Sequence, residues 1–126
     1  KSMARLCRHS PIPIALDEEL IGVNIPSMKE GLLDALRPTY LVLKPSLHGG
    51  MAGCTEWIRM AKERGVGSWI TSALESNVGL NAIAHFCAKT YGPNISMAQG
   101  LGTGQLFTDN VPMPLVIRGN KLWYEN

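Results

Sequence analysis

Acidic and basic side chains follow two short apolar runs of this sequence. Asp17 and Glu18 come at the end of the run 12–17, and Lys44 ends the run 40–44. If these runs are neighbouring parallel strands, their carboxyl ends lie about 4.8 Å apart at one edge of a sheet. A carboxylate is a hard oxygen ligand for Mg²⁺, and a lysine near a metal can transfer protons near neutral pH. The pattern indicates a metal-assisted acid–base site, although an ordinary salt bridge uses the same residue types.

Further candidate residues follow the next two apolar runs, 68–72 and 95–99. They are Thr71, Ser72, Glu75, Gly100 and Gly102. The two hydroxyl groups can donate hydrogen bonds to a substrate carboxylate, although a serine at a strand end also bonds to backbone groups. Glu75 either supports the lysine or stabilises the start of the following helix, where an acidic side chain is favourable. The two glycines either present N–H groups to an anion or form a tight turn.

Segments with helical spacing separate the four strand-like runs. The expected helices are the end of one over 2–8, one that begins after Pro26, one over 51–64, and one that starts after Ser76 and ends before Tyr91, Gly92 and Pro93. Ser27 with Glu30 predicts a capping box for the second of these helices. Apolar spacing predicts a buried face on the third helix, made of Met51, Cys54, Ile58 and Ala61. On the last helix the corresponding residues are Leu80, Ile83, Ala84 and Cys87.

This alternation of helices and strands predicts an α/β fold with a parallel sheet and right-handed crossovers. Four strands cannot close a barrel, because a complete (β/α)₈ barrel needs on the order of 250 residues. The alternatives are therefore an open doubly wound sheet and part of a barrel. The segment 104–126 breaks the alternation, and we expect it to be an arm that packs against another surface.

The composition is that of a globular domain rather than a disordered chain. The 126 residues are 45% hydrophobic, and 12 basic against 10 acidic residues give a net charge of +2. The basic residues are scattered, which predicts no nucleic-acid partner. The sequence has three cysteines without a CxxC pair and no apolar stretch of membrane-spanning length, so we expect a cytoplasmic protein without a membrane partner. The glycine pair after His48 predicts a surface loop for this histidine.

Three segments resemble motifs of the enolase superfamily. The segment 13–19, PIALDEE, is similar to its fifth-strand motif, and 41–45, LVLKP, with Gly49 and Gly50, resembles the sixth-strand lysine motif of the muconate-cycloisomerase-like subgroup. The segment 70–76, ITSALES, is similar to the seventh-strand motif. The resemblance implies the C-terminal half of a (β/α)₇β TIM-like barrel, with the fifth to eighth strands in residues 1–103. The arm 104–126 would then reach toward a capping domain.

The resemblance also implies roles for individual residues. Asp17 would be a carboxylate ligand of Mg²⁺, or of Mn²⁺ as an alternative, and Glu18 would support the metal site without binding the ion. Lys44 would be the catalytic cation, with Glu75 beside it. Thr71, Ser72, Gly100 and Gly102 would bind a small-molecule carboxylate substrate. The assignments of Asp17 and Lys44 follow from the matched motifs, whereas those of Ser72, Glu75, Gly100 and Gly102 rest on the residue types and keep the alternatives given above.

Within the subgroup, the stretches around Lys44 and Ser72 are most similar to the o-succinylbenzoate synthases, lyases of menaquinone biosynthesis. Amino-acid racemases and dipeptide epimerases share these signatures, and a half-barrel without catalysis is an alternative of another class. By resemblance, the base lysine, two metal carboxylates and the capping domain belong to an N-terminal part that these residues do not include. We therefore expect the isolated chain to be inactive and to need that part, or further copies of itself, as a partner.

Overall fold

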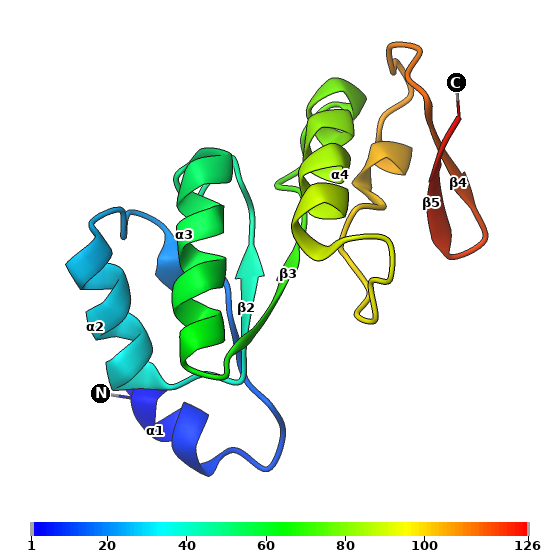
Figure 1. The fold of residues 1–126 in the computed structure, drawn as a ribbon. Helices are drawn as coiled ribbons and strands as arrows, with labels where there is room; N and C mark the ends of the chain where they lie inside the picture. The colour runs from blue at the N-terminus through cyan, green and yellow to red at the C-terminus, as the bar shows by residue number, and fades with distance from the viewer. Residues whose placement is uncertain (1, 126) are drawn as a thin grey trace. The chain divides into compact units, whose positions relative to one another are not determined.

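The structure is a computed structural model that describes residues 2–125. The chain divides into two compact units, Lys1–Trp69 and Ile70–Asn126, and each is described by itself (Figure 1). Both units contain helices and strands, which confirms the predicted α/β class. The domain boundary predicted at residues 103 and 104 stays a prediction.

The first unit contains three helices, a short 3-10 helix and a small sheet. Their bounds are α1 Ser2–His9, β1 Ala15–Leu16, η1 Glu18–Leu20, α2 Pro26–Leu36, β2 Tyr40–Leu43, α3 Gly50–Glu63 and β3 Gly67–Ile70. The sheet order is β1-β2-β3, and β1 is parallel to β2, with Ala15 opposite Tyr40. Leu16, Leu41 and Leu43 are fully buried. The predicted parallel pairing of the first two strands is confirmed, although β1 is shorter than the run 12–17 from which it was inferred.

Helix α2 begins without the predicted capping box. Its first residue is Pro26, the preceding residue is Ile25, and no side chain caps the helix. The capping-box prediction is therefore wrong, because Ser27 is the second residue of the helix and the N-cap position is occupied by Ile25, which has no capping oxygen on its side chain. The helix ends at Arg37, which adopts the left-handed conformation with φ 48°. Pro38 follows and prevents continuation of the helix.

Helix α3 buries a face that agrees only in part with the one that the apolar spacing predicts, since Cys54 and Ala61 are buried as predicted. Its buried residues are Cys54, Trp57, Met60 and Ala61. Met51 is exposed and Ile58 is only half-buried, so the predictions for these two residues are wrong. The Trp57 side chain is the largest that is completely buried, and the helix turns this ring inward. The spacing of apolar residues does not identify this face, because burial of a large aromatic side chain is more favourable than burial of methionine or isoleucine.

A buried lysine connects α2 to α3, which lie side by side (Figure 1). Lys29 is 2% exposed, and its ammonium lies 2.9 Å from Glu56 Oε1. It also donates a hydrogen bond to the Gly53 carbonyl at 3.2 Å and lies 5.2 Å from the centre of the Trp57 ring. These three partners replace the water that the charge loses on burial, which is the condition for tolerating a charge inside a protein.

The second unit contains α4 Asn77–Tyr91, η2 Thr103–Leu106, β4 Leu115–Arg118 and β5 Lys121–Tyr124. Helix α4 has Ser76 at its N-cap, so the predicted start is confirmed, and its C-cap is Gly92, so the helix includes Tyr91, one residue beyond the predicted end. Its buried residues are Leu80, Ile83 and Cys87, as predicted, whereas Ala84 is half-buried. Burial raises the pKa of the Cys87 thiol to about 11, so this free thiol stays protonated at neutral pH.

The strand predicted over 95–99 does not form. Within the described residues this segment makes only an isolated bridge between Gly100 and Thr71. The Gln99 side chain accepts the hydrogen bond of the Ile70 N–H at 2.8 Å, and the Gly100 N–H donates to the Ile70 carbonyl at 2.9 Å. The Gln99 side chain takes the place of a backbone acceptor, so the prediction of a regular strand is wrong. Gly100 nevertheless pairs with Thr71, at the position that the predicted strand would occupy.

Strands β4 and β5 form an antiparallel hairpin that the sequence did not predict. Leu115 lies opposite Tyr124, and Arg118 opposite Lys121. The connecting turn places Gly119 in the left-handed region with φ 62°, as the first central position of a type II′ turn requires. The Tyr124 ring meets His85 of α4 edge to face at 5.2 Å, which ties the hairpin to this helix.

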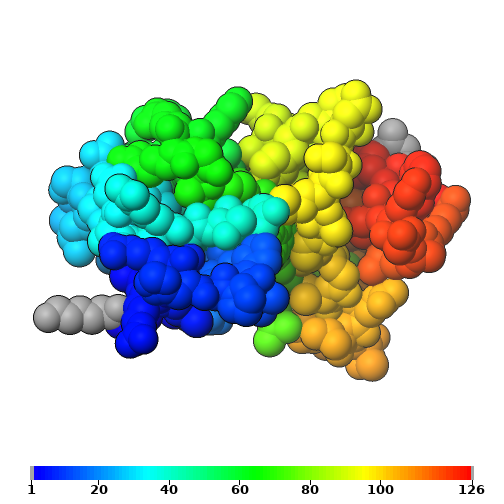
Figure 2. Space-filling view, turned by 90° about the horizontal axis from the view of Figure 1, so that it is seen from below, coloured from blue at the N-terminus to red at the C-terminus, as the bar shows by residue number. Residues whose placement is uncertain are grey.

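Figure 2 shows α1 in dark blue at the surface of the first unit, and no residue of this helix is buried. Among residues 2–125, no helix combines the length and the apolar character that crossing a membrane would need.

Two glycines inside helices provide a matched test of the first unit. Gly31 in α2 has open space around an added Cβ, whereas a Cβ at Gly53 in α3 would lie 2.5 Å from the His48 carbonyl oxygen. We expect Gly31→Ala to raise the free energy of unfolding by about 0.5–1 kcal/mol, because alanine loses less backbone entropy in a helix. Gly53→Ala should lower it by about 1–3 kcal/mol through overpacking. Denaturant unfolding measures both, and equal effects would contradict the described contact.

Candidate active site

The candidate site lies at the carboxyl ends of β1 and β2. Asp17 follows β1, Lys44 follows β2, and Lys44 Nζ lies 2.7 Å from Asp17 Oδ2 and 3.3 Å from Glu18 Oε1. The side chains of Lys44 and Asp17 are 15% and 28% exposed, whereas that of Glu18 is 73% exposed. The structure thus brings together the acid and the lysine that the sequence places at neighbouring strand ends. The roles of these residues stay predictions.

The local charges keep the lysine protonated. Burial by itself lowers the pKa of Lys44, but the hydrogen bonds to Asp17 and Glu18 and their negative charges outweigh this effect, so the net shift is upward. The pKa of Glu18 is lowered, first by a hydrogen bond from its own backbone N–H and then by Lys44. In this arrangement Lys44 is an ammonium at neutral pH, suited to stabilising a developing negative charge rather than to removing a proton.

One oxygen of Asp17 fits a metal ligand. Asp17 Oδ1 is buried and has no hydrogen-bond partner among residues 2–125. Burial of a carboxylate oxygen without a partner is unfavourable, and a hard cation such as Mg²⁺ would satisfy it. In the part of the chain that is described, no cluster of three or more His, Cys, Asp or Glu side chains could hold an ion. Asp17 can therefore supply one ligand of a site that needs further ligands from elsewhere.

His48 is placed wrongly by the sequence analysis. The predicted surface loop is contradicted, since His48 is only 1% exposed. Its ring Nδ1 accepts a hydrogen bond from the Lys44 backbone N–H at 2.9 Å. Burial is the main cause that lowers the pKa of His48, and the ring is therefore neutral at pH 7. The signal in the sequence was the pair Gly49 and Gly50, whose left-handed φ values of 86° and 71° turn the chain back toward the strand end.

Thr71, Ser72 and Gly100 come together in the second unit. The Thr71 hydroxyl donates to the Gly100 carbonyl at 2.8 Å, and the Ser72 N–H donates to the same oxygen at 3.2 Å. A Cβ at Gly100 would collide with the Thr71 side chain, so this close approach requires glycine. The Ser72 hydroxyl pairs with the Thr103 hydroxyl. Both predicted hydroxyl groups thus have partners within the protein, and their role in substrate binding stays a prediction.

The other two predicted residues lie in turns of the second unit. Gly102 precedes η2 with φ −88°, a conformation that does not require glycine. Glu75 accepts a hydrogen bond from the Ala73 N–H at 2.6 Å and closes the turn before α4. The same turn holds Leu74 in the left-handed region with φ 62°, at a cost of about 1 kcal/mol. The predicted roles of Gly102 and Glu75 stay predictions.

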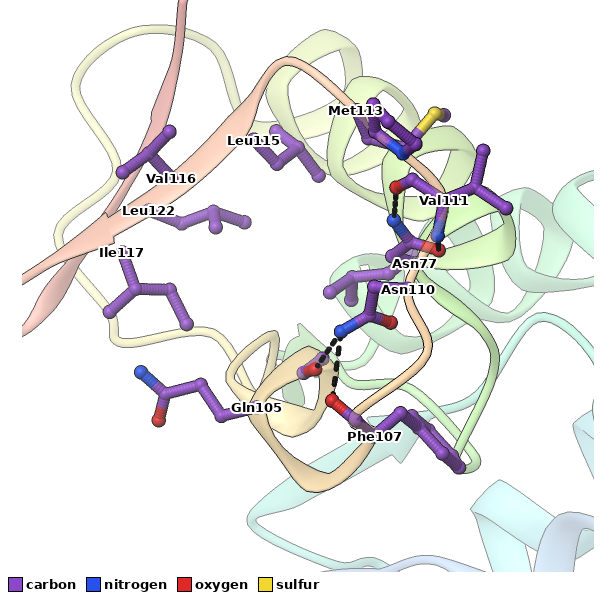
Figure 3. Close-up of a pocket in the computed structure, with 13 residues that line it drawn as sticks. Asn77, Gln105, Phe107, Asn110, Val111, Met113, Leu115, Val116, Ile117 and Leu122 are labelled. Atoms are coloured by element: carbon purple, nitrogen blue, oxygen red, sulfur yellow. Dashed lines mark hydrogen bonds between the residues drawn. The ribbon is translucent and has the colours of Figure 1, made fainter.

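A groove of about 490 Å³ lies beside the hairpin of the second unit (Figure 3). Asn77 exchanges hydrogen bonds with the backbone of Val111, and Asn110 donates to the carbonyls of Gly104 and Phe107, each at 3.0 Å. The described residues that line this groove include no acidic, basic, histidine or cysteine side chain. The groove therefore offers no acid–base chemistry, and the candidate site remains the one around Lys44.

Comparison with known proteins relates the chain to a family and to individual enzymes. Residues 1–122 match the enolase C-terminal domain-like family. The o-succinylbenzoate synthase of Desulfotalea psychrophila is 56% identical over 120 residues, which are 95% of this chain and 32% of that protein. The o-succinylbenzoate synthase of Haemophilus influenzae is 38% identical over 85 residues, which are 68% of this chain and 24% of that protein. The chain thus spans at most about a third of the length of these relatives.

Solved structures agree with this relationship. The crystal structure of MenC from Desulfotalea psychrophila superimposes with a TM-score of 0.87 at 54% identity, covering 95% of this chain and 33% of that chain. The muconate lactonizing enzyme of Pseudomonas putida gives a TM-score of 0.79 at 22% identity, covering 95% of this chain and 32% of that chain, and so shows the same fold. The predicted resemblance is confirmed. With a family match over nearly all of its residues and this α/β fold, the chain belongs to the enolase C-terminal domain-like family.

Proposed function

We propose that this chain is the C-terminal part of a Mg²⁺-dependent o-succinylbenzoate synthase. The observation that carries the proposal is the ion pair of Lys44 and Asp17 at neighbouring strand ends, in a chain that is 56% identical to a synthase of this name. The reaction would be dehydration of 2-succinyl-6-hydroxy-2,4-cyclohexadiene-1-carboxylate in menaquinone biosynthesis. The matched family supports a lyase of the enolase superfamily rather than a binding module.

In this proposal β1, β2 and β3 are the fifth, sixth and seventh strands of a (β/α)₇β barrel, and the segment before Gly100 takes the place of the eighth. The parallel pairing of β1 with β2 and the bridge of Gly100 to Thr71 support this order. Residues 1–103 would be the barrel part, and the arm 104–126, which includes the hairpin, would reach the capping domain. The N-terminal half of the barrel and that domain would be the partners of this chain.

Asp17 would supply one carboxylate to the metal through Oδ1, the buried oxygen that lacks a hydrogen bond. Glu18 would add negative charge beside it while remaining bonded to Lys44. The bound Mg²⁺, or Mn²⁺, would make the proton next to the substrate carboxylate more acidic. The two further carboxylates that the resemblance implies would come from earlier strands of the barrel.

Lys44 would stabilise the charge that develops during the reaction. Removal of the proton α to the carboxylate leaves an enediolate, and the Lys44 ammonium, already protonated beside Asp17, would offset its negative charge without reorganisation. The hydroxyl group on the neighbouring carbon then leaves, so one water molecule is lost in total and the ring becomes aromatic. The base would be a lysine of an earlier strand, not Lys44.

The hydroxyl groups of Thr71 and Ser72 and the backbone of Gly100 and Gly102 would line the substrate site. The Gly100 N–H already donates to the Ile70 carbonyl, so no anion-binding role is proposed for this N–H. The link of Thr71 and Ser72 to Gly100 supports this assignment, because it fixes the two segments to each other. Glu75 would contribute indirectly, by stabilising the turn that precedes α4. We place the protein in the cytoplasm, and we expect the isolated chain to be inactive because a single carboxylate holds Mg²⁺ weakly.

The proposal is tested with the longer protein that carries this chain. We expect Mg²⁺-dependent formation of o-succinylbenzoate from the cyclohexadiene carboxylate. The ultraviolet absorbance of the aromatic product measures the rate. N-acylamino acids and dipeptides are assayed in parallel. Racemisation or epimerisation without dehydration would contradict the proposal, and no turnover of any substrate by the folded protein would favour a module without catalysis.

The role of Lys44 predicts a large loss of turnover. In the longer protein, Lys44→Met should lower kcat by about 100- to 1,000-fold, because one preorganised charge that stabilises the transition state is removed. Steady-state assays measure this loss, with Lys62→Met, a substitution of an exposed lysine in α3, as the matched control. A Lys44→Met enzyme as active as the control would exclude Lys44 from the chemistry.

The role of Asp17 predicts weaker metal binding. Asp17→Asn in the longer protein should raise the dissociation constant for Mg²⁺ by about 10- to 100-fold or more, since a charged ligand becomes a neutral amide. Calorimetric titration with Mg²⁺ measures this without reference to turnover. Glu30→Gln, which removes an exposed carboxylate of α2, serves as the control and should leave the affinity unchanged. Unaltered affinity of the Asp17→Asn protein would show that this carboxylate does not bind the metal.

A further inference from the structure

His48 holds both polar groups of the Lys44 peptide backbone. Its ring Nδ1 accepts from the Lys44 N–H at 2.9 Å, and its own backbone N–H donates to the Lys44 carbonyl at 3.0 Å. The Leu47 N–H donates to the same carbonyl at 2.9 Å. A single residue therefore fixes the peptide units on the two sides of the Lys44 Cα, from which the ammonium reaches Asp17 at 2.7 Å.

The ring is needed at this place because the strand has ended. Strand β2 stops at Leu43, and the Lys44 N–H donates to the His48 ring. A buried N–H without an acceptor is unfavourable. The imidazole supplies the acceptor that a carbonyl of a neighbouring strand supplies within a sheet. Since Nδ1 accepts, it carries no proton, and the proton of the neutral ring lies on Nε2. Nε2 itself is buried without a hydrogen-bond partner in residues 2–125.

Glycines hold His48 in this position. Gly49 and Gly50 adopt φ values of 86° and 71°, which reverse the chain between His48 and α3. Gly53, one turn into α3, lets the helix approach the His48 carbonyl so closely that a Cβ would lie 2.5 Å from it. The imidazole is thus clamped between the end of β2 and the first turn of α3, and its freedom to move is small.

We infer that His48 is a positioning residue of the active site, whose neutral imidazole, through the bond from the Lys44 N–H to Nδ1, directs the Lys44 ammonium toward Asp17. This inference deepens the proposed function and rests on it for the catalytic consequence only. The hydrogen bond and the resulting position of Lys44 are properties of the protein that hold without substrate. No contact of His48 with the substrate or the metal is required.

The hydrogen bond is tested by nuclear magnetic resonance on the ¹⁵N-labelled longer protein. We expect a scalar coupling across the hydrogen bond between the Lys44 amide nitrogen and His48 Nδ1, and an imidazole spectrum of the Nε2–H tautomer. A histidine that stabilises the fold without a bond to Lys44 would show no coupling to the Lys44 amide nitrogen. Absence of the coupling, or a proton on Nδ1, would overturn the inference even if the enzyme is active.

Two substitutions then separate positioning from folding. His48→Leu introduces an apolar side chain of similar size and removes the acceptor, whereas His48→Asn places an amide oxygen near the position of Nδ1. We expect His48→Leu to lower kcat about 10- to 100-fold, because the ammonium is displaced, with KM within about twofold. His48→Asn should recover most of kcat. His9→Leu, at an exposed position at the end of α1, is the control.

Crystal structures of the variants provide the second measurement. In His48→Leu the Lys44 ammonium should leave the contact with Asp17, and in His48→Asn it should retain it. Equal kcat values for the wild type and a folded His48→Leu enzyme, or an unchanged ion pair in its structure, would overturn the inference. An inactive wild type would contradict the proposed function instead, and the coupling and the ion pair would still decide whether His48 positions Lys44.

Discussion

The ion pair between Lys44 and Asp17 is the interaction on which the candidate site of the first unit depends. Both charged side chains are partly buried, and each residue directly follows one of the two paired strands. A half-buried ammonium and carboxylate must satisfy each other, because the cost of leaving one unpaired exceeds the gain from the pair. The register of β1 against β2 pairs Leu16 with Leu41, one residue before Asp17, and the ion pair leaves Asp17 Oδ1 without a hydrogen-bond partner among residues 2–125.

Much of the arrangement follows from local patterns in the sequence. The alternation of apolar runs and helical segments predicted the α/β class, the start of α4 and the parallel pairing of β1 with β2, since these depend on residues close in the chain. The position of Asp17 and Lys44 at neighbouring strand ends also follows from the sequence. This position reflects a geometric regularity of parallel sheets that holds whatever the side chains are.

The failures have physical causes that a linear pattern does not contain. The prediction for α3 was wrong at Met51 and Ile58, because burial of the large Trp57 ring is more favourable than burial of these two side chains. The segment 95–99 has the composition of a strand, but the Gln99 side chain takes a backbone hydrogen bond that a regular ladder would use. His48 is polar and precedes two glycines, which is typical of a surface loop, yet these glycines bend the chain so that the imidazole enters the interior.

The buried Lys29 has a consequence for the turn that follows Lys44. Its ammonium bonds the Gly53 carbonyl, and Gly53 is in close contact with His48, which in turn carries Lys44. A replacement of Lys29 would therefore act first on the Gly53 carbonyl, in the first turns of α3 beside His48. Loss of the Lys29 ammonium would leave the Gly53 carbonyl and Glu56 without their shared partner, so a residue of α2 supports the turn that follows Lys44.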